Sequence, residues 1–245
     1  MHSTNKSIKR HQGRINGARV CVFAMLTVTT VLTAITCGIT LTAHAQQAPD
    51  GFVSLFNGRD LTGWKGLVGT PITRPQMSAD QMAAEQAKAN ELASKNWVID
   101  DGTLLYQGDG YDNLVTAEAY GDFELLMEWK IEPGADSGLY LRGTPQVQIW
   151  DGDQNAAGSG GLYNNQNHPS EPSENADKPA GEWNTFRIRM VGQQVSVWLN
   201  GKLVVDSVVL ENYWDRNQAI YERGAIELQA HTTKVWFRNI YIKQL

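Results

Sequence analysis

Apolar and polar residues alternate along most of the chain after residue 50, which is the pattern of β-strands with one buried face. Gly, Asn, Asp and Pro separate the short alternating runs, as they do in antiparallel sandwiches and barrels. An Asn200-Gly201 pair lies between two such runs and predicts a two-residue hairpin. The full pattern predicts strands near residues 53–56, 97–106, 113–118, 122–131, 137–142, 145–151, 183–191, 194–200, 203–209, 224–231 and 234–243.

One segment departs from this alternation and predicts a short inserted helix near residues 78–94. It consists largely of Ala, Gln, Glu, Lys, Met and Leu, which are good helix formers. Ser78, followed by Gln81 three positions later, forms a capping box at its start. We expect a surface helix that packs through Met82, Ala89 and Leu92, with a lid over a site as the alternative.

In five of the predicted strands, the side chains opposite the core are polar or aromatic. Many are Trp, Tyr, Arg, Gln or His, which combine flat apolar surfaces with planar hydrogen-bonding groups, as a sugar ring requires. The pattern favours a carbohydrate cleft over an ordinary solvated face, in which Arg187 and Arg189 would pair with acids. The positions are Glu124, Glu128, Lys130, Tyr140, Arg142, Gln146, Gln148, Trp150, Arg187, Arg189, Glu227, Gln229 and His231.

Residues 1–45 have the organisation of an export signal. Five basic residues and no acid precede or flank an apolar stretch from Val20 to Leu41, and Ala43-His44-Ala45 has the spacing of a cleavage site. Cleavage would leave residues 46–245 as one domain. Because the apolar stretch approaches membrane-spanning length, a retained N-terminal anchor is the main alternative, and a lipoprotein attached at Cys37 is less favoured. Each alternative places the domain outside the cytoplasm, in the periplasm or the extracellular space.

Charge, cysteine content and missing motifs exclude several functional classes. The chain has 21 basic and 26 acidic residues, and loss of the basic leader would make it more acidic, which argues against nucleic acid or an anionic membrane surface as partner. Both cysteines, Cys21 and Cys37, lie in the leader, which excludes disulfide scaffolds, zinc ribbons and cysteine hydrolases. The sequence contains no HExxH, GxSxG, P-loop or Rossmann glycine motif. Ala156 and Leu162 break the calcium-loop pattern that begins at Asp151.

Nine short motifs follow one another along the chain, and each alone is weakly informative. They are FNGRDLTGW at 56–64, GDFE at 121–124 with EWK at 128–130, DSG at 136–138 with Arg142, VQIWD at 147–151, GGLY at 160–163, GEWNT at 181–185, LNG at 199–201, IELQAH at 226–231 and FRNI at 237–240. In this order they resemble the 3-keto-disaccharide hydrolase family over about Gly51 to Leu245. Gln146 stands where many members carry Glu, and Asp136 where many carry Asn, which could change substrate or metal preference.

The resemblance implies an all-β, concanavalin A-like jelly roll of two curved antiparallel sheets that hold ligands in the concave face. It also implies cleavage of 3-keto-glycosides. Oxidation at C3 makes the C2 proton acidic, so a modest base removes it, the anomeric group leaves by β-elimination and water adds to the enone. A retaining glucanase of similar architecture needs paired carboxylates in E-x-D-x-x-E spacing, which Glu128 and Glu132 do not supply.

The implied site needs a base, a stabiliser for the enolate oxygen and an acid. We expect His231 as base, with Arg142 or a divalent cation such as Ca²⁺, Mg²⁺ or Mn²⁺ at the enolate oxygen. Asp151 and Glu128 would act as acids or, with His231, as metal ligands, so these three should approach one another in the cleft. A separate sugar 3-dehydrogenase would supply the carbohydrate substrate in its oxidised form. The residues expected to hold the sugar are Gln148, Tyr163, Trp150, Gln229 and Tyr140.

Each catalytic assignment has a structural alternative. His231 could close a strand end, Asp151 could bond its own backbone in a turn, and Glu128 could pair with Arg142. For the protein as a whole, the alternatives are a non-catalytic carbohydrate-binding module and a structural domain, both of the cell envelope.

Overall fold

The computed structural model of the protein describes residues 47–245. The expected leader at 1–45 lies outside these residues, as do Cys21 and Cys37. Within residues 47–245, no helix is both long enough and apolar enough to cross a membrane.

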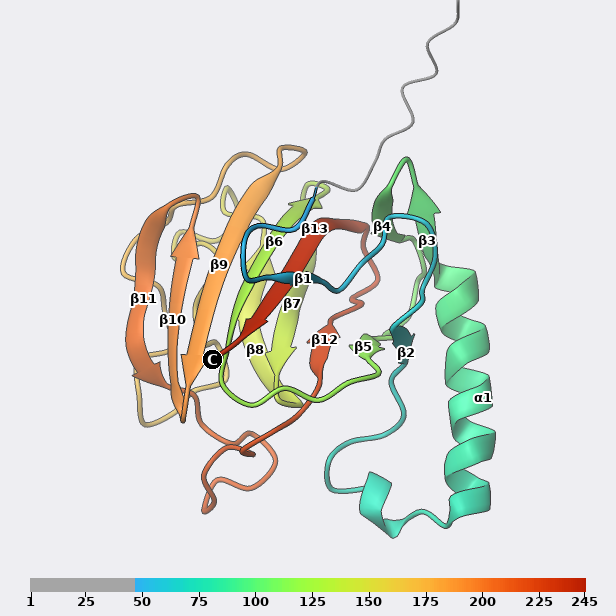
Figure 1. Cartoon of the computed structure of the whole chain (residues 1–245). Helices are drawn as coiled ribbons and strands as arrows, with labels where there is room; N and C mark the ends of the chain where they lie inside the picture. Colours follow the sequence, from blue (N-terminus) through green and yellow to red (C-terminus); the bar gives the residue numbers. More distant parts are fainter. Residues whose placement is uncertain (1–46) are drawn as a thin grey trace, which may run out of the picture. The chain divides into compact units, whose positions relative to one another are not determined.

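The strands form two antiparallel sheets packed face to face (Figure 1). The eight-stranded sheet has the order β11 (Lys202–Val209), β10 (Gln194–Leu199), β9 (Asn184–Val191), β6 (Phe123–Ile131), β13 (Val235–Gln244), β4 (Thr103–Tyr106) and β3 (Trp97–Asp100), with β1 (Val53–Ser54) paired to β13. The five-stranded sheet has the order β2 (Trp64–Gly66), β5 (Leu114–Thr116), β12 (Ile226–Leu228), β7 (Asp136–Leu141) and β8 (Thr144–Trp150).

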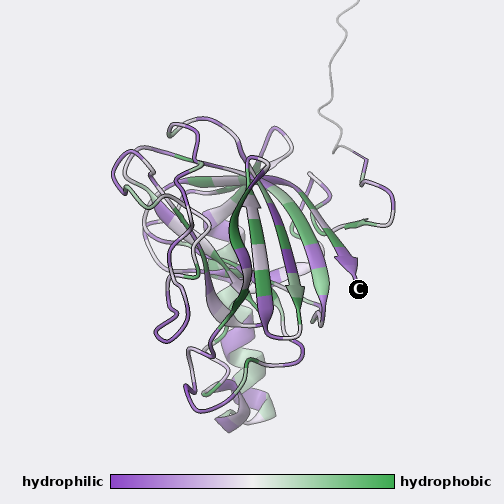
Figure 2. Ribbon diagram, turned by 90° about the vertical axis from the view of Figure 1, so that its left-hand side faces the viewer, coloured by the Kyte–Doolittle hydropathy of each residue, from purple (hydrophilic) through white to green (hydrophobic). Residues whose placement is uncertain are grey.

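Alternate residues of the strands fill the space between the sheets. In β6, Phe123, Leu125 and Met127 are buried, while the side chains between them point outward. Figure 2 shows this alternation as stripes along the strands. Leu139 of β7 and Leu228 of β12 belong to the same core cluster. The arrangement confirms the all-β jelly-roll sandwich that the sequence predicts.

Two turns explain one expected and one unexpected feature of the strands. Asn200 and Gly201, with φ angles of 51° and 84°, take the left-handed conformation that a two-residue hairpin requires, and they join β10 to β11 as predicted. The run at 97–106 is not one strand, because Asp101 and Gly102, with φ angles of 45° and 73°, fold it into the β3–β4 hairpin. β2 was not predicted, since its residues Trp64–Gly66 follow Gly63 and end in a glycine, so they belong to no alternating run.

The predicted helix is α1 (Ala79–Asn96), which ends slightly later than expected. Ser78 caps it: the Ser78 hydroxyl accepts from the Gln81 backbone N–H (3.2 Å), and the Gln81 side chain accepts from the Ser78 N–H (2.9 Å). The short 3₁₀ helix η1 (Arg74–Gln76) precedes it. The capping box therefore forms as the sequence predicts.

Helix α1 packs against the edge strand β2 of the five-stranded sheet. The Gln86 amide donates to the Gly66 carbonyl (2.8 Å), and the Asn90 side chain accepts from the Gly66 N–H (3.1 Å). A side chain at Gly66 would overlap the carbonyl group of Ala89, so glycine permits the close approach. Leu92, expected in the contact, is exposed, because the stripe of less exposed residues runs through Met82, Gln86, Ala89 and Ala93.

The polar strand faces that the sequence assigned to one cleft lie on two opposite outer surfaces of the sandwich. β6 and β9 belong to the eight-stranded sheet, whereas β7, β8 and β12 belong to the five-stranded sheet. Since both sheets fill the same core, alternation identifies outward-facing side chains but not the sheet that carries them. On the eight-stranded sheet, Arg187 donates to Glu124 (2.6 Å), which is the ion pairing expected of an ordinary solvated face.

Candidate functional site

A hollow of about 430 Å³ lies on the outer face of the five-stranded sheet, and we call it the His231 hollow. Gln148 lies between the core residues Val147 and Ile149, so its side chain points away from the core into this hollow. The structure brings together His231 and all of the residues expected to hold a sugar: Tyr140, Gln148, Trp150, Tyr163 and Gln229.

Strand pairing sets the positions of the two glutamines. β7 lies between β8 and β12, and Gly138 of β7 is the register partner of Gln148. On its other side, the Gly138 carbonyl accepts from the Gln229 backbone N–H (2.9 Å). Gln148 and Gln229 therefore flank β7 at the same level of the sheet.

Buried amides orient the carboxyl of Asp136, the one acid among the described residues that line the hollow. Gln148 Nε2 donates to Asp136 Oδ1 (2.7 Å) and to the Ser137 carbonyl (3.0 Å). Gln146 Nε2 donates in turn to Gln148 Oε1. Because Gln146 and Gln148 are both buried, this chain of hydrogen bonds holds Asp136 in a fixed orientation.

Thr233 links the backbone of Asp136 to that of His231. Its hydroxyl oxygen accepts from the Asp136 N–H (3.3 Å) and donates to the His231 carbonyl (3.1 Å). The one acid and the one histidine among the described residues that line the hollow are thus held on neighbouring segments of chain.

Aromatic rings surround the polar groups of the hollow. Trp150 and Tyr163 meet edge to face with ring centroids 5.4 Å apart, and Tyr111 meets the His231 ring in the same way at 5.1 Å. Tyr163 is 55% exposed and Tyr111 68% exposed, so their rings are open to a ligand. Exposed rings beside planar polar groups suit the apolar faces and hydroxyls of a sugar.

Two further groups of the hollow have unusual environments. Burial, and then the negative charge of Glu227, raises the pKa of Tyr140 to about 12, so its hydroxyl keeps its proton at neutral pH. Gln229 Oε1 is buried and has no hydrogen-bond partner among residues 47–245. An unsatisfied buried acceptor costs about 1–3 kcal/mol, and such costs are commonly retained at functional sites.

Glu128 does not join this hollow, contrary to the expectation from the sequence. It lies on the outer face of the eight-stranded sheet, where it accepts from Arg238 Nε (2.8 Å) and from the Asn239 amide (2.8 Å). Its partner is therefore not Arg142 either. Because the two sheets separate it from His231, Glu128 is not positioned to act on the same substrate.

Asp151 also lies outside the hollow, although Trp150 beside it is inside. It is buried, and its carboxylate accepts from the backbone N–H groups of Gly134 (2.8 Å) and Asp153 (3.0 Å). This is the turn role that the sequence left open as the alternative. The side chain follows the end of β8, where alternation no longer fixes its direction.

Arg142 is a structural connector. It lies in the turn after β7 with a φ of 53°, beyond the alternation that placed it on the polar face, and it is 2% exposed. Its guanidinium donates to the carbonyls of Gly121 (2.9 Å) and Gly192 (2.8 Å) and to Asp122 (2.7 Å). These contacts tie three loops together and leave it outside the His231 hollow.

The expected divalent-cation site of His231, Asp151 and Glu128 does not form. Within residues 47–245, no group of three or more His, Cys, Asp or Glu side chains is arranged to hold a metal ion. The reason is the same sheet assignment that separates Glu128 from His231. A cation held by this set of donors is therefore not part of the site.

Six lining residues were not among the predicted site residues: Asp136, Pro145, Gln146, Asn164, Tyr213 and Trp214. Asp136 lies within the DSG motif and Gln146 directly precedes VQIWD; both were noted as departures from the family pattern, and Gln146 also as a polar-face position. Tyr213 and Trp214 stack edge to face at 4.9 Å in a loop before β12. An adjacent pair of large aromatic residues in a polar loop was the sequence signal that could have identified them.

Comparisons with known proteins agree with this fold. A 3-keto-disaccharide hydrolase of Bacteroides thetaiotaomicron is 24% identical over 80% of this chain and 79% of its own. Two solved proteins of Parabacteroides distasonis ATCC 8503, each described as a candidate glycosyl hydrolase, are also similar. One has a TM-score of 0.56 and 23% identity, covering 80% of this chain and 94% of its own. The other has a TM-score of 0.50 and 25% identity, covering 62% and 91%. The sequence pattern of the 3-keto-alpha-glucoside-1,2-lyase-like domain matches residues 51–243, and the chain therefore belongs to that family.

Proposed function

We propose that the protein cleaves 3-keto-glycosides, including 3-keto-disaccharides, in the His231 hollow. The observation that carries this proposal is one hollow that combines a histidine, an oriented carboxyl, buried amides and exposed aromatic rings. Membership of the family and the name of the Bacteroides relative support the same substrate class.

In the proposed reaction, His231 removes the C2 proton, and the electron pair of the C2–H bond forms an enolate with the C3 oxygen. The enolate expels the substituent on C1, the protonated histidine returns its proton to the leaving oxygen, and an enone remains. Water then adds, its oxygen to C1 and a proton to C2. These steps balance without an oxidant, a reductant or a covalent enzyme intermediate.

Two groups of the hollow take the roles that were expected of Arg142, Asp151 and Glu128. Tyr140, whose hydroxyl keeps its proton, donates to the enolate oxygen. The carboxylate of Asp136 stabilises the imidazolium that forms when His231 takes the proton. Trp150 and Tyr163 hold the oxidised ring through its apolar faces.

The substrate and the location of the reaction complete the proposal. A 3-keto sugar must come from oxidation of a C3 hydroxyl, so a separate sugar 3-dehydrogenase acts before this protein. The basic and apolar leader at 1–45 supports export, which would place both steps outside the cytoplasm.

Two variants test the site. His231→Ala should reduce turnover of a 3-keto-glucoside by roughly 100-fold or more, the scale of a lost general base, while leaving sugar affinity little changed. Glu128→Gln is the matched control, since Glu128 lies on the other sheet and its loss should leave turnover within about twofold. Wild-type turnover in His231→Ala would refute the site. Sugar binding without turnover in the wild-type protein would identify a binding module instead.

A further inference from the structure

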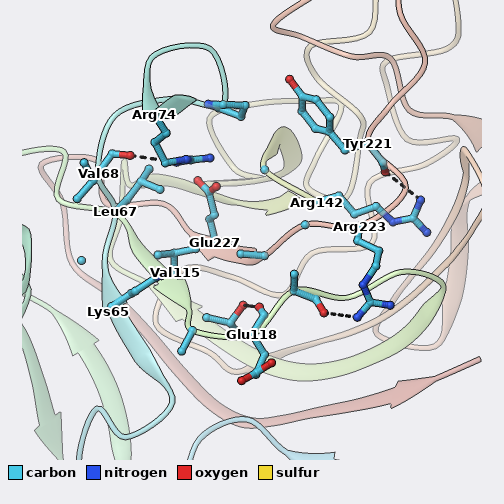
Figure 3. Close-up of a pocket in the computed structure, with 18 of the residues that line it drawn as sticks. Lys65, Leu67, Val68, Arg74, Val115, Glu118, Arg142, Tyr221, Arg223 and Glu227 are labelled. Atoms are coloured by element: carbon cyan, nitrogen blue, oxygen red, sulfur yellow. Dashed lines mark hydrogen bonds between the residues drawn. The ribbon is translucent and has the colours of Figure 1, made fainter. Parts of the chain in front are cut away.

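A second hollow, of about 440 Å³, lies on the same sheet face (Figure 3). Its floor is formed by Val115 of β5 and Glu227 of β12, and we call it the Glu227 hollow. The segment 67–74 and two residues of α1, Met82 and Gln86, form its walls. Helix α1, which the sequence predicted as a surface helix, therefore forms part of the wall of a cavity.

Glu227 lies at the bottom of this hollow without a partner. It is 2% exposed, and among residues 47–245 no backbone or side-chain group donates a hydrogen bond to its carboxyl. Burial raises its pKa to about 7, and the charge of Arg74 only partly opposes that change. Figure 3 shows the carboxyl directed into the cavity. A buried carboxyl with no donor is costly to the fold, so its retention suggests a role with a ligand.

Arg74 faces Glu227 across the open space. Its Nη1 donates to the carbonyls of Val68 (3.0 Å) and Gly69 (3.4 Å), which holds the guanidinium over the hollow (Figure 3). A Cβ atom added at Gly143 would lie 3.7 Å from Glu227 Oε1 and 3.9 Å from Arg74 Nη2, so both polar atoms border one small space. Glycine at position 143, with a φ of 75°, keeps that space free of a side chain.

The charges and walls of the hollow select the chemical class of the ligand. A hydroxyl can donate to the Glu227 carboxyl and accept from the Arg74 guanidinium at the same time. Two further guanidinium groups line the hollow, but Arg142 donates to the Gly121 carbonyl (2.9 Å) and Arg223 donates to the Ala119 carbonyl (2.6 Å), which engages them with the protein itself. Val68, Pro71 and Met82 offer apolar surface for C–H groups. A neutral polyol with apolar faces, such as a sugar ring, satisfies both requirements.

The two hollows adjoin one another. Glu227 and Gln229 lie on the same face of one chain segment, about 7 Å apart at the rise of a β-strand, which is close to the length of one sugar ring. Tyr140, the cross-strand partner of Glu227, lines the His231 hollow. Trp214, which also lines the His231 hollow, donates through Nε1 to the carbonyl of Gly143 (2.7 Å) in the Glu227 hollow.

We propose that the Glu227 hollow binds the second sugar unit of a disaccharide substrate, the unit on the leaving side of the cleaved bond, with one hydroxyl bridging Glu227 and Arg74. This inference rests on the proposed function, because it takes the His231 hollow as the place of the oxidised ring. It makes Glu227 a specificity-determining residue for the leaving group, with no part in the chemical step.

Two substrates that share the same oxidised ring test the inference: a 3-keto-disaccharide and the methyl glycoside of the same 3-keto sugar. Glu227→Leu should raise KM for the disaccharide roughly 10-fold or more, the scale of one lost hydrogen bond to a charged group. Turnover of the methyl glycoside should stay within about twofold, since methanol does not reach the hollow. Arg74→Leu should have the same selective effect. Glu222→Gln, which removes an exposed acid outside the hollow, is the control.

Equal effects of Glu227→Leu on the two substrates, or no effect on either, would overturn the inference while leaving the proposed function intact. If the wild-type protein cleaves neither substrate, the proposed function fails. Calorimetric binding of the unoxidised disaccharide and its methyl glycoside then decides the inference alone. Disaccharide binding weakened by Glu227→Leu supports a sugar site, and unchanged or absent disaccharide binding contradicts it. A thermal unfolding scan confirms that each variant is folded.

Discussion

Replacing Glu227 by glutamine should stabilise the protein at alkaline pH and leave its stability nearly unchanged in acid. Burial raises the pKa of Glu227 from 4.5 to about 7 in the folded chain, and the side chain is 2% exposed, so solvent screens little of this effect. Each pKa unit between the folded and unfolded states corresponds to about 1.4 kcal/mol. The ionised carboxylate therefore costs the fold about 3 kcal/mol, a substantial part of the stability of a typical domain.

The sign of the effect follows from proton binding. Below about pH 4.5 the carboxyl is protonated in both states, and the cost is absent. Between pH 4.5 and about 7 the unfolded chain releases the proton that the folded chain keeps, so folding becomes less favourable as the pH rises. Above about pH 7 both states are ionised and the full cost applies. Glu227→Gln removes a cost that exists only at the upper end of this range.

Urea unfolding followed by tryptophan fluorescence at pH 4, 6 and 8 measures this difference directly. The free energy of unfolding of Glu227→Gln should exceed that of the wild-type protein by about 3 kcal/mol at pH 8 and by little at pH 4. Gln86→Ala is the control, because it removes a non-titrating contact of the same hollow and should change stability equally at each pH. A difference between Glu227→Gln and wild type that does not vary with pH would refute the reasoning.

Two further predictions concern stability elsewhere in the fold. Arg142→Ala should lower the free energy of unfolding by about 3 kcal/mol or more in urea titrations, because one guanidinium serves several loops; near-wild-type stability would contradict its structural role. Burial by itself would raise the pKa of Glu211. Hydrogen bonds from the backbone N–H groups of Gln166, Asn167 and His168 outweigh the effect of burial and lower the pKa to about 2. Glu211→Gln should therefore destabilise the protein at neutral pH, and the difference should fade as the pH falls from about 4.5 towards 2; a loss independent of pH would count against this.

Local features of the fold could be predicted because interactions between residues close in the sequence determine them. The alternation in β6, the capping box of α1 and the Asn200-Gly201 hairpin all appear where the sequence placed them. Each depends on residues a few positions apart. β2 was not predicted because it lies in no alternating run and forms through pairing with β5.

The membership of strands in the two sheets could not be predicted in the same way. Alternation put Glu128 and His231 on the polar side of their segments, but Glu128 lies in β6 of one sheet and His231 follows β12 of the other, and pairing between distant segments decides that. Arg142 and Asp151 follow the ends of β7 and β8, where turns reset the direction of the side chain. The expected site therefore lost Glu128 because sheet membership depends on distant pairing, and it lost Arg142 and Asp151 because alternation stops where their strands end.

Burial by distant segments explains why Glu227 was overlooked. Alternation placed it correctly on one face with Gln229 and His231, and an exposed glutamate there would have no special property. Its environment comes from Arg74 and from Met82 of α1, which lie far earlier in the chain. No pattern within the strand itself indicates that these distant residues bury Glu227.

The proposed chemistry depends on the ketone at C3, so the most direct test compares a 3-keto-glucoside with its unoxidised parent. Both carry the same aglycone, and its release is followed with the purified chain under identical conditions. We expect release from the 3-keto-glucoside and none above background from the parent, because only the ketone makes the C2 proton acidic enough for His231 to remove. Comparable rates of release from the two compounds would contradict the elimination mechanism and indicate an ordinary glycosidase.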